Sequence, residues 1–281
     1  ALDAQSGSIK WLWDPIPKSP TDRASATWSS QSNLNTGAAN AWAPLTADPS
    51  SGLIFVPTSS PSPDFFGGER LGDNLYSNSI VALDGATGEI VWFQQLVHHD
   101  VWDYDLPAQP TLTTIKRGSE SHDAVVVVTK TGMLFAFDRD TGKPIYEIEE
   151  KAVPQSKVSG EVTSPTQPFS TIAALANQSP VTTKDAFGVI FFDKLSCRRQ
   201  IRKFESNGIF TPPSLEGIIM RPGYAGGSNW GGVAIDPDRQ IAVTNVNEIP
   251  ALVRLVPRVD LGRLKAEGKL KGWPVSYTHL T

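Results

Sequence analysis

Apolar residues occur in short runs along the chain, separated by polar turns that are rich in Gly, Pro and Asp. Most of these runs consist of β-branched and aromatic residues, which favour β-strands over helices. The clearest predicted strands are AVVVVTK (124–130), MLFAFD (133–138), GLIFVP (52–57), GVIFFD (188–193) and IAVTNV (241–246). The pattern therefore predicts an all-β fold made of many short strands.

An eleven-residue pattern is repeated three times, and it has the character of a β-hairpin. ALDAQSGSIKW (1–11) aligns with ALDGATGEIVW (82–92) and with AFDRDTGKPIY (136–146). In each copy an apolar strand ends at an Asp that starts a turn, a Gly supplies a positive φ, and a second strand follows. Three matching copies are difficult to attribute to chance, so we expect a repeat architecture.

A second unit pairs WAPLTADPSSGLIFV (42–56) with WGGVAIDPDRQIAV (230–243), where a Trp precedes Asp-Pro by the same interval and an apolar strand follows. Short strands with repeated hairpins predict a β-propeller of four-stranded blades. At roughly 40–50 residues per blade, the chain would hold about four to six. Helical periodicity is weak, with 259–273 as the best candidate, and the stretches 59–79 and 156–167 are expected to be inter-strand loops.

Composition narrows the class of protein. The 281 residues include 19% charged residues and a net charge of −4, without the basic face expected of a nucleic-acid binder. No apolar run reaches the roughly 20 residues that span a bilayer, and no signal peptide is visible. The single cysteine, Cys197, excludes an internal disulfide and a cysteine-built metal cage, and we interpret it as a packed thiol.

Both ends of the chain are expected to be truncated. The first repeat starts at Ala1 with no earlier strand to pair with it. The last residues, VSYTHLT (275–281), match one reading frame of the transposon-end adapter used in sequencing libraries. We therefore expect a partial propeller domain over 1–274 and a non-native tail over 275–281, and assign His279 no function.

The stretch VHHDVWDYDLPAQP (97–110) is the strongest candidate for chemistry, because it combines His, Asp and aromatic residues. A metal site is disfavoured, since adjacent histidines point to opposite faces of a strand and few other histidines exist. His98 and His99 are instead expected to be orienting or core residues. A solvated loop is disfavoured because Trp102 and Tyr104 are costly to leave exposed. A carboxylate beside a tryptophan at the end of a strand can instead act as a general base on a substrate hydroxyl, at the centre of the propeller.

The order of these motifs resembles the membrane-bound quinoprotein dehydrogenases, such as the glucose, quinate and shikimate dehydrogenases, which use pyrroloquinoline quinone (PQQ). The resemblance covers residues 1 to about 258 and includes the hairpin motif, VHHDVWDYDLPAQP, TKTG, SPTQPFS, GIFTPPS and NWGGVAIDP. The hairpin alone marks PQQ propellers in general, whereas the VHHD stretch is specific to this subfamily. The resemblance implies that the chain is part of an eight-bladed quinoprotein propeller.

The resemblance also implies roles for individual residues. Asp103 matches the catalytic base, which would take the proton of the substrate hydroxyl as hydride leaves for PQQ. Lys130 matches the lysine at the quinone oxygens, and Trp42 matches the tryptophan on which the cofactor ring stacks. Asn229 and Trp230 are further candidates for contact with PQQ. Ser62 stands where relatives have a threonine that helps to hold calcium, which is a departure from the family pattern.

The activity implied is oxidation of a sugar or cyclic polyol hydroxyl, with glucose as the favoured substrate and quinate or shikimate as alternatives. Calcium would assist, ubiquinone would accept the electrons, and the protein would face the periplasm from the bacterial inner membrane, through an N-terminal anchor outside this chain. Two rivals remain. A non-catalytic propeller scaffold would not need Asp103, Lys130 and Trp42 together. A soluble PQQ alcohol dehydrogenase would show an adjacent cysteine pair that this chain lacks.

Overall fold

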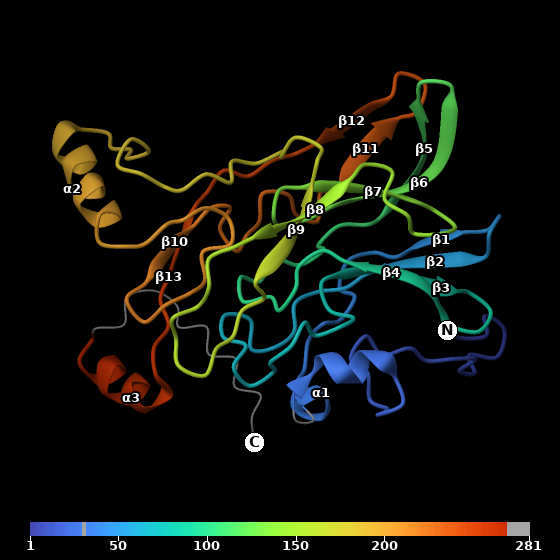
Figure 1. Cartoon of the computed structure of the whole chain (residues 1–281), viewed down its shortest axis with the longest axis horizontal. Coiled ribbons are helices and arrows are strands. Elements are labelled where there is room, and N and C mark those ends of the chain that lie inside the picture. The colour runs from blue at the N-terminus through green and yellow to red at the C-terminus, as the bar shows by residue number, and fades with distance from the viewer. Residues whose placement is uncertain (30–31, 269–281) are drawn as a thin grey trace.

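The computed structural model describes residues 1–29 and 32–268, and it is dominated by antiparallel β-sheets (Figure 1). The predicted tail, 275–281, lies outside the described residues. The strands are β1 (Thr46–Asp48), β2 (Leu53–Pro57), β3 (Ser79–Asp84), β4 (Ile90–Gln95), β5 (Thr111–Arg117), β6 (Glu120–Val128), β7 (Leu134–Asp138), β8 (Ile148–Ala152), β9 (Thr166–Ser170), β10 (Ile218–Met220), β11 (Val233–Asp236), β12 (Ile241–Thr244) and β13 (Ala251–Val253). The helices are a 3₁₀ turn (Arg23–Thr27), α1 (Ser32–Asn35), α2 (Phe191–Ile201) and α3 (Arg258–Ala266).

The first sheet is a four-stranded meander in the order β1-β2-β3-β4, the predicted form of a propeller blade. Its inner strand β3 is buried along almost its whole length, and Phe55 of β2 pairs with Ala82 of β3. Continuous apolar runs such as 80–83 are typical of strands that are covered on both faces. The predicted all-β propeller fold is confirmed, and this sheet has the four strands predicted for a blade.

The second sheet, β5-β6-β7, has three strands, and an isolated bridge from Phe137 to Pro144 continues it at the outer edge. The hairpin β11-β12 lies beside β5, where Gln240 bonds to the backbone of Thr114 and Lys116. Two further pairs, β8-β9 and β10-β13, complete the sheets of the described chain. The pairing of β10 with β13 joins segments that lie on either side of β11-β12 in the sequence.

All three copies of the eleven-residue pattern form the same turn. In the second copy the N–H of Asp84 donates to the carbonyl of Glu89, and the N–H of Gly88 donates to the carbonyl of Asp84. The first and third copies repeat both hydrogen bonds. The turn glycines of the three copies have φ values of 70°, 78° and 69° (Gly7, Gly88 and Gly142). The hairpins predicted from the sequence are therefore confirmed, and only glycine enters this backbone region without strain.

The tryptophan that closes one copy packs on the turn of the next copy. The indole N–H of Trp11 donates to the carbonyl of Gly85 at 3.0 Å, and that of Trp92 donates to the carbonyl of Arg139 at 3.0 Å. A Cβ added to Gly142 would lie 2.5 Å from Cδ2 of Trp92. The repeat therefore connects neighbouring sheets as well as forming hairpins.

The helices depart from the sequence-based expectations in one respect. The expected helix at 259–273 is present as α3, which ends at Ala266 within the described residues. The run GVIFFD (188–193), predicted to be a strand, instead leads into α2, and that prediction was wrong. Among the described residues this run pairs with no strand and its apolar side chains stay exposed, so strand propensity alone did not determine the local structure.

Candidate active site

The predicted site lies on the segment that leaves β4 and crosses the interior before β5 begins. Nearly all of residues 96–108 are buried, although they form no regular strand. Two of them, His99 and Asp103, have positive φ values of 44° and 59°. Such values are uncommon outside glycine and persist where the surrounding contacts hold them.

The carboxylate of Asp100 holds this segment in shape. It accepts the backbone N–H of Trp102 at 2.8 Å and that of Tyr104 at 2.8 Å, on either side of Asp103. The amide of Asn78 donates to the same carboxylate at 2.9 Å, and the hydroxyl of Ser60 also donates to it. Because both neighbours of Asp103 are held by one buried group, Asp100 determines how Asp103 is presented.

Aromatic rings form the wall behind the segment. The indole N–H of Trp102 donates to the carbonyl of Thr211 at 2.8 Å, and the hydroxyl of Tyr104 donates to the carbonyl of Pro222 at 2.6 Å. Phe210 packs edge-on against Trp102, with ring centroids 5.1 Å apart. Both polar aromatic groups are satisfied, so the prediction that these rings are buried rather than solvated is confirmed.

Asp103 and Lys130 are brought together, although 27 residues separate them. Nζ of Lys130 lies 3.0 Å from Oδ2 of Asp103 and 2.8 Å from Oδ2 of Asp105. Lys130 is nearly buried, with 8% of its side chain exposed, whereas Asp103 retains 23%. One ammonium group is thus shared by two carboxylates, and Asp103 is the one that faces outwards.

The pKa of Asp103 is raised from its ordinary value into the range around neutral pH. Burial, followed by repulsion from Asp105, raises the pKa of Asp103 to about 8, against the lowering effect of Lys130. Burial lowers the pKa of Lys130, but Asp105 and Asp103 together raise it above its ordinary value. Lys130 therefore stays charged, and Asp103 can exchange a proton near neutral pH, as a general base must.

The other predicted cofactor residues form no hydrogen bond with Asp103 or Lys130 in the described part of the chain. Trp42 lies before β1, and 46% of its side chain is exposed. Trp230, with 76% exposed, and Asn229 follow a turn whose Gly226 packs against Lys130: a Cβ there would lie 2.6 Å from Cγ of Lys130. Contact of these three side chains with a cofactor remains a prediction.

The fit to PQQ is nevertheless favourable around Lys130. The hydroxyl of Ser228 is buried without a hydrogen-bond partner in the described structure, two residues from Gly226. A buried ammonium, an unpartnered hydroxyl and exposed indoles suit a flat ligand that carries several carboxylates. The residues present thus fit such a cofactor in part.

The fit to calcium is poor in this part of the protein. Ser62 is half-buried, and its N–H donates to the carbonyl of Gly37 at 3.1 Å. Within residues 1–29 and 32–268, no three His, Cys, Asp or Glu side chains come together as possible metal ligands. Calcium takes six to eight oxygen ligands, so we derive no step through a metal ion.

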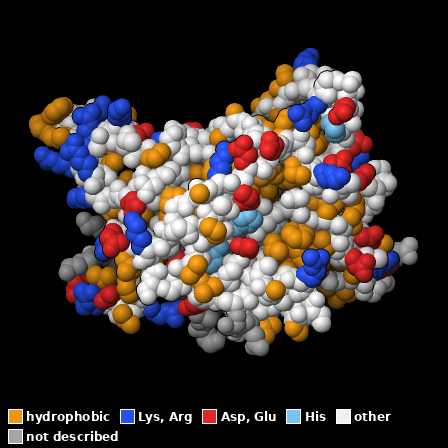
Figure 2. Space-filling model, in the orientation of Figure 1, with side chains coloured by type: hydrophobic (Ala, Val, Ile, Leu, Met, Phe, Trp, Pro, Cys, Tyr) orange, Lys and Arg blue, Asp and Glu red, His pale blue; other side chains and the backbone are white. Residues whose placement is uncertain are grey.

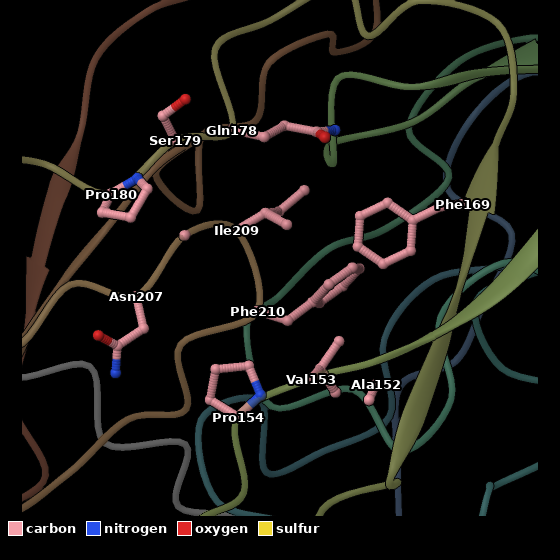
Figure 3. Close-up of a pocket in the computed structure, with 11 residues that line it drawn as sticks. Ala152, Val153, Pro154, Phe169, Gln178, Ser179, Pro180, Asn207, Ile209 and Phe210 are labelled. Carbon is pink, nitrogen blue, oxygen red and sulfur yellow. The ribbon is translucent and has the colours of Figure 1, made fainter.

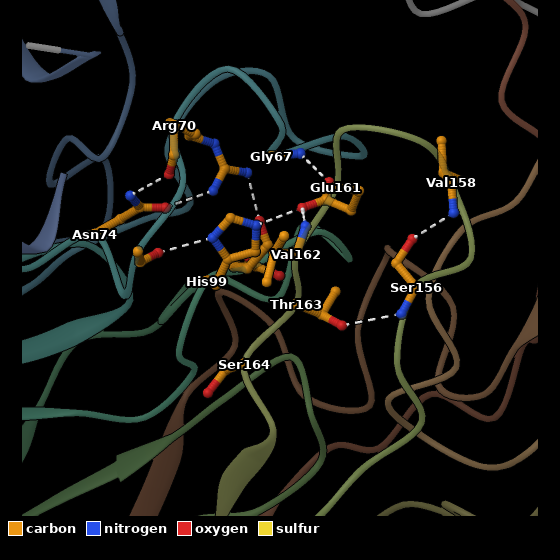
Figure 4. A network of polar contacts seen from close by, with 12 residues as sticks. Gly67, Arg70, Asn74, His99, Ser156, Val158, Glu161, Val162, Thr163 and Ser164 are labelled. Carbon is orange, nitrogen blue, oxygen red and sulfur yellow. Dashed lines mark hydrogen bonds and ion pairs between the residues drawn. The ribbon is translucent and has the colours of Figure 1, made fainter. Parts of the chain in front are cut away.

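His99 belongs to a buried network that the sequence did not reveal (Figure 4). Nδ1 of His99 lies 2.7 Å from the carbonyl of Gly72, and Nε2 lies 2.6 Å from Oε1 of Glu161. Burial raises the pKa of Glu161, but the hydrogen bond and charge of His99 bring it below its ordinary value. Both ring nitrogens face acceptors, so the ring forms an ion pair with Glu161. The expectation that His99 is a core residue is confirmed.

Arg70 links this network to the Asp103 segment. It is completely buried, and its guanidinium donates to the carbonyls of Pro63 and Asp100 and to Oδ1 of Asn74. Burial lowers the pKa of Arg70 to about 10, against the raising effect of Asp100. Neither Arg70 nor Glu161 stands in a distinctive local pattern, and their pairing depends on loops that meet only in the folded chain.

A cavity of about 330 Å³ lies elsewhere, between β8-β9 and the loop at 207–210 (Figure 3). Its lining is mostly apolar, and Phe169 and Phe210 meet edge-on in it, 5.5 Å apart. None of the predicted site residues lines it, although Phe210, which does, contacts the ring of Trp102 in the Asp103 segment. We therefore base the function on Asp103 and Lys130 rather than on this cavity.

Comparison with known proteins gives consistent matches. The family described as "PQQ: Glucose/ethanol/alcohol dehydrogenase, beta-propeller domain" matches residues 1–279. The chain is 39% identical over 262 residues to quinoprotein glucose dehydrogenase A of Acinetobacter calcoaceticus, covering 91% of this chain and 32% of that protein. It is 38% identical to the glycerol dehydrogenase large subunit of Gluconobacter oxydans (91% and 34% covered) and 32% identical to quinate/shikimate dehydrogenase of Acinetobacter baylyi (91% and 31%).

Among solved structures, the fold is similar to that of quinohemoprotein alcohol dehydrogenase from Comamonas testosteroni. The TM-score is 0.60 at 24% identity, covering 89% of this chain and 33% of that one. This similarity bears on the fold alone. The chain spans about a third of the length of the relatives it matches.

Proposed function

This chain belongs to the PQQ-dependent glucose/ethanol/alcohol dehydrogenase β-propeller family, and from that premise we propose that it forms part of a quinoprotein dehydrogenase oxidising a sugar or polyol hydroxyl. The observation that carries the proposal is the buried contact between Asp103 and Lys130 at 3.0 Å. A carboxylate with a pKa raised to about 8 beside a fixed cation is suited to removing a hydroxyl proton.

In this proposal Asp103 takes the proton from the substrate hydroxyl while the carbon that bears this hydroxyl loses a hydride. PQQ, when bound, would supply the acceptor for that hydride. Lys130 would hold the cofactor oxygens by hydrogen bonds and favour negative charge there. Asp100 would keep Asp103 in its left-handed conformation through the two N–H groups that it accepts.

Trp42 is proposed as the surface on which the cofactor ring stacks, because its indole is half exposed and free to take a flat ligand. Trp230 and Asn229 are proposed as further contacts, since their turn packs against Lys130. Calcium, with Ser62 as one oxygen ligand, stays part of the proposal through the resemblance of this chain to its family. Its remaining ligands would come from outside the described residues.

The substrate that we favour is glucose, because quinoprotein glucose dehydrogenases are matched at 36–39% identity. Quinate or shikimate is the alternative, supported by relatives at 32–34%. Glycerol dehydrogenase subunits at 36–38% extend the alternatives to acyclic polyols. We propose ubiquinone as the electron acceptor and the periplasmic side of the inner membrane as the location. No helix in the described residues is long and apolar enough to span a bilayer.

The test uses the protein that contains this chain, loaded with PQQ and calcium. Reduction of an artificial dye is followed with glucose, quinate, shikimate and glycerol in turn. We expect one substrate class to sustain turnover and Asp103→Asn to lower kcat by about 10²–10⁴-fold. The matched control is Asp140→Asn, which changes an exposed turn. A loaded protein that oxidises none of the four, or an Asp103→Asn variant with full turnover, would contradict the proposal.

A further inference from the structure

Residues 187–203 form a surface that combines exposed apolar side chains with exposed basic ones. We name the apolar part the apolar tip (Phe187, Val189, Ile190, Phe191 and Phe192) and the basic part the basic collar (Lys194, Arg198, Arg199, Arg202 and Lys203). We propose that this surface docks on an anionic phospholipid membrane, with the apolar tip in the interface and the basic collar at the phosphates. The inference rests on the membrane location in the proposed function, and it names the surface of this chain that contacts the membrane.

The apolar tip is more exposed than isolated surface hydrophobic residues require. Phe187 is 79% exposed, Val189 87%, and Phe191 and Phe192 are each 74% exposed. The rings of Phe191 and Phe192 contact each other edge-on, 5.8 Å apart. Contiguous apolar surface of this kind is costly in water and marks an interaction site.

The basic collar is the second, independent observation. The segment carries five basic residues and one acid, Asp193, a net charge of +4 within a chain whose net charge is −4. All five bases are exposed, and within the described chain none of them forms an ion pair with a carboxylate. Arg198 donates only to the carbonyl of Thr183, at 3.3 Å. Positive charge without internal partners complements a negatively charged surface.

The apolar tip lies at the start of α2 and the basic collar lies farther along it, which is the order that matches an apolar membrane interior followed by phosphates. α2 stands away from the sheets at one corner of the molecule (Figure 1), and Figure 2 shows hydrophobic and basic side chains gathered there. The tip surrounds the start of α2, and the collar follows along it. From Phe192 to Arg199 the helix rises about 10 Å, which separates the tip from the arginines of the collar along the helix axis.

The charge pattern favours lipid over a second copy of this chain. A second copy offers an acidic surface overall but the same +4 segment, so a symmetric contact through this surface would bring like charges together. An anionic bilayer offers both components at once, an apolar interior and a layer of phosphates. The residues involved lie outside the Asp103 site, so loss of docking and loss of dehydrogenase activity are separate outcomes.

The first experiment measures binding of the purified chain to vesicles by flotation, without cofactor. Vesicles of phosphatidylcholine with about 30% phosphatidylglycerol, which gives their surface a negative charge, are compared with vesicles of phosphatidylcholine alone. We expect binding to the anionic vesicles only. Phe191→Ser with Phe192→Ser should lower the affinity about tenfold or more, and Arg198→Gln with Arg199→Gln and Arg202→Gln should lower it by a similar factor.

Matched controls change the same chemistry elsewhere. Leu12→Ser, at a side chain 87% exposed, removes an equally exposed apolar group, and Lys116→Gln with Lys143→Gln and Arg239→Gln removes three exposed bases outside the collar. Both should leave vesicle binding within twofold of the original chain. Circular dichroism and the thermal midpoint confirm that every variant is folded before its binding is interpreted.

A second experiment reports on the depth of the tip. Because Cys197 is the single cysteine, Cys197→Ser with Val189→Cys gives one labelling site in the tip, and Cys197→Ser with Leu12→Cys gives a control site. An environment-sensitive fluorophore should brighten at position 189 on anionic vesicles and stay unchanged at position 12. The proposal is overturned if anionic vesicles do not bind the chain, if tip and collar variants bind as before, or if the tip mediates self-association without binding lipid.

Discussion

Nζ of Lys130 lies 3.0 Å from Oδ2 of Asp103, on a lysine that also contacts the carboxylate of Asp105. The arrangement makes the proton affinity of Asp103 depend on a single positive charge in a buried environment. Burial and Asp105 raise the pKa of Asp103, and Lys130 opposes both effects. These opposing effects on the pKa of Asp103 can be tested by removing either the lysine or the aspartate.

Removing the cation should shift the pH dependence of activity. With Lys130→Met, Asp103 and Asp105 face each other without a counter-charge, so the pKa of Asp103 rises further. We expect the rising limb of the kcat/KM profile to move to higher pH by at least about one unit. Lys143→Met, at an exposed turn, is the control. Because an unpaired buried carboxylate destabilises the fold, Lys130→Arg is measured in parallel and should keep the original profile. A profile unchanged in Lys130→Met would rule out this coupling.

Removing the carboxylate should change the pH dependence of stability. The pKa of Asp103 is raised from 3.8 to about 8, so between these values the folded chain binds a proton that the unfolded chain has lost. Its contribution to stability is therefore fully present below pH 4 and is lost as pH rises through about 8, at no more than about 1.4 kcal/mol per pH unit. The free energy of unfolding of Asp103→Asn should fall less than that of the original chain between pH 5 and pH 9. Parallel curves from urea titrations would show that Asp103 has an ordinary pKa.

Substitutions at two turn glycines can distinguish the cost of backbone strain from the cost of disturbed packing between sheets. Gly7 and Gly142 occupy the same position in the repeat, with φ of 70° and 69°. A Cβ at Gly7 meets nothing within 4 Å, whereas one at Gly142 lies 2.5 Å from the ring of Trp92. Gly7→Ala should cost about 1 kcal/mol through strain alone. Gly142→Ala should cost about 2 kcal/mol more, because the ring of Trp92 must move. Equal denaturation midpoints for the two variants would show that Trp92 does not hold the sheets together.

Adjacent histidines provide a comparison between a buried and an exposed ion pair. His99 pairs with Glu161 at 2.6 Å, with 1% and 4% of the two side chains exposed. His98 pairs with Glu150 at 3.1 Å, with 22% and 49% exposed. Glu161→Gln should lower the free energy of unfolding by about 3 kcal/mol, since it leaves a buried charge uncompensated. Glu150→Gln should change it by less than about 1 kcal/mol. Chemical denaturation at pH 6 measures both, and similar losses would contradict the assigned burial.

The local part of this fold could be predicted from the sequence. The turn that begins at Asp84 closes through hydrogen bonds within six residues, so its pattern of Asp, Thr and Gly is sufficient to identify it. The strands at 52–57 and 124–130 were recognised from their β-branched and aromatic runs for the same reason. The role of Asp103 was predicted from the resemblance of VHHDVWDYDLPAQP to a family and stays a prediction, whereas its contact with Lys130 is an observation of the structure.

The contacts between residues that are far apart in the sequence were decided by the tertiary structure. Glu161 reaches His99 across 62 residues, and Arg70 reaches the carbonyl of Asp100 across 30, with no local pattern that marks either partner. The run at 188–193 has the composition of a strand, yet it leads into α2, and it pairs with no strand of the described chain. Turns and strands depend on residues that are close in sequence. Buried ion pairs, the elevated pKa of Asp103 and an exposed apolar tip depend on which segments the folded chain brings together or leaves uncovered.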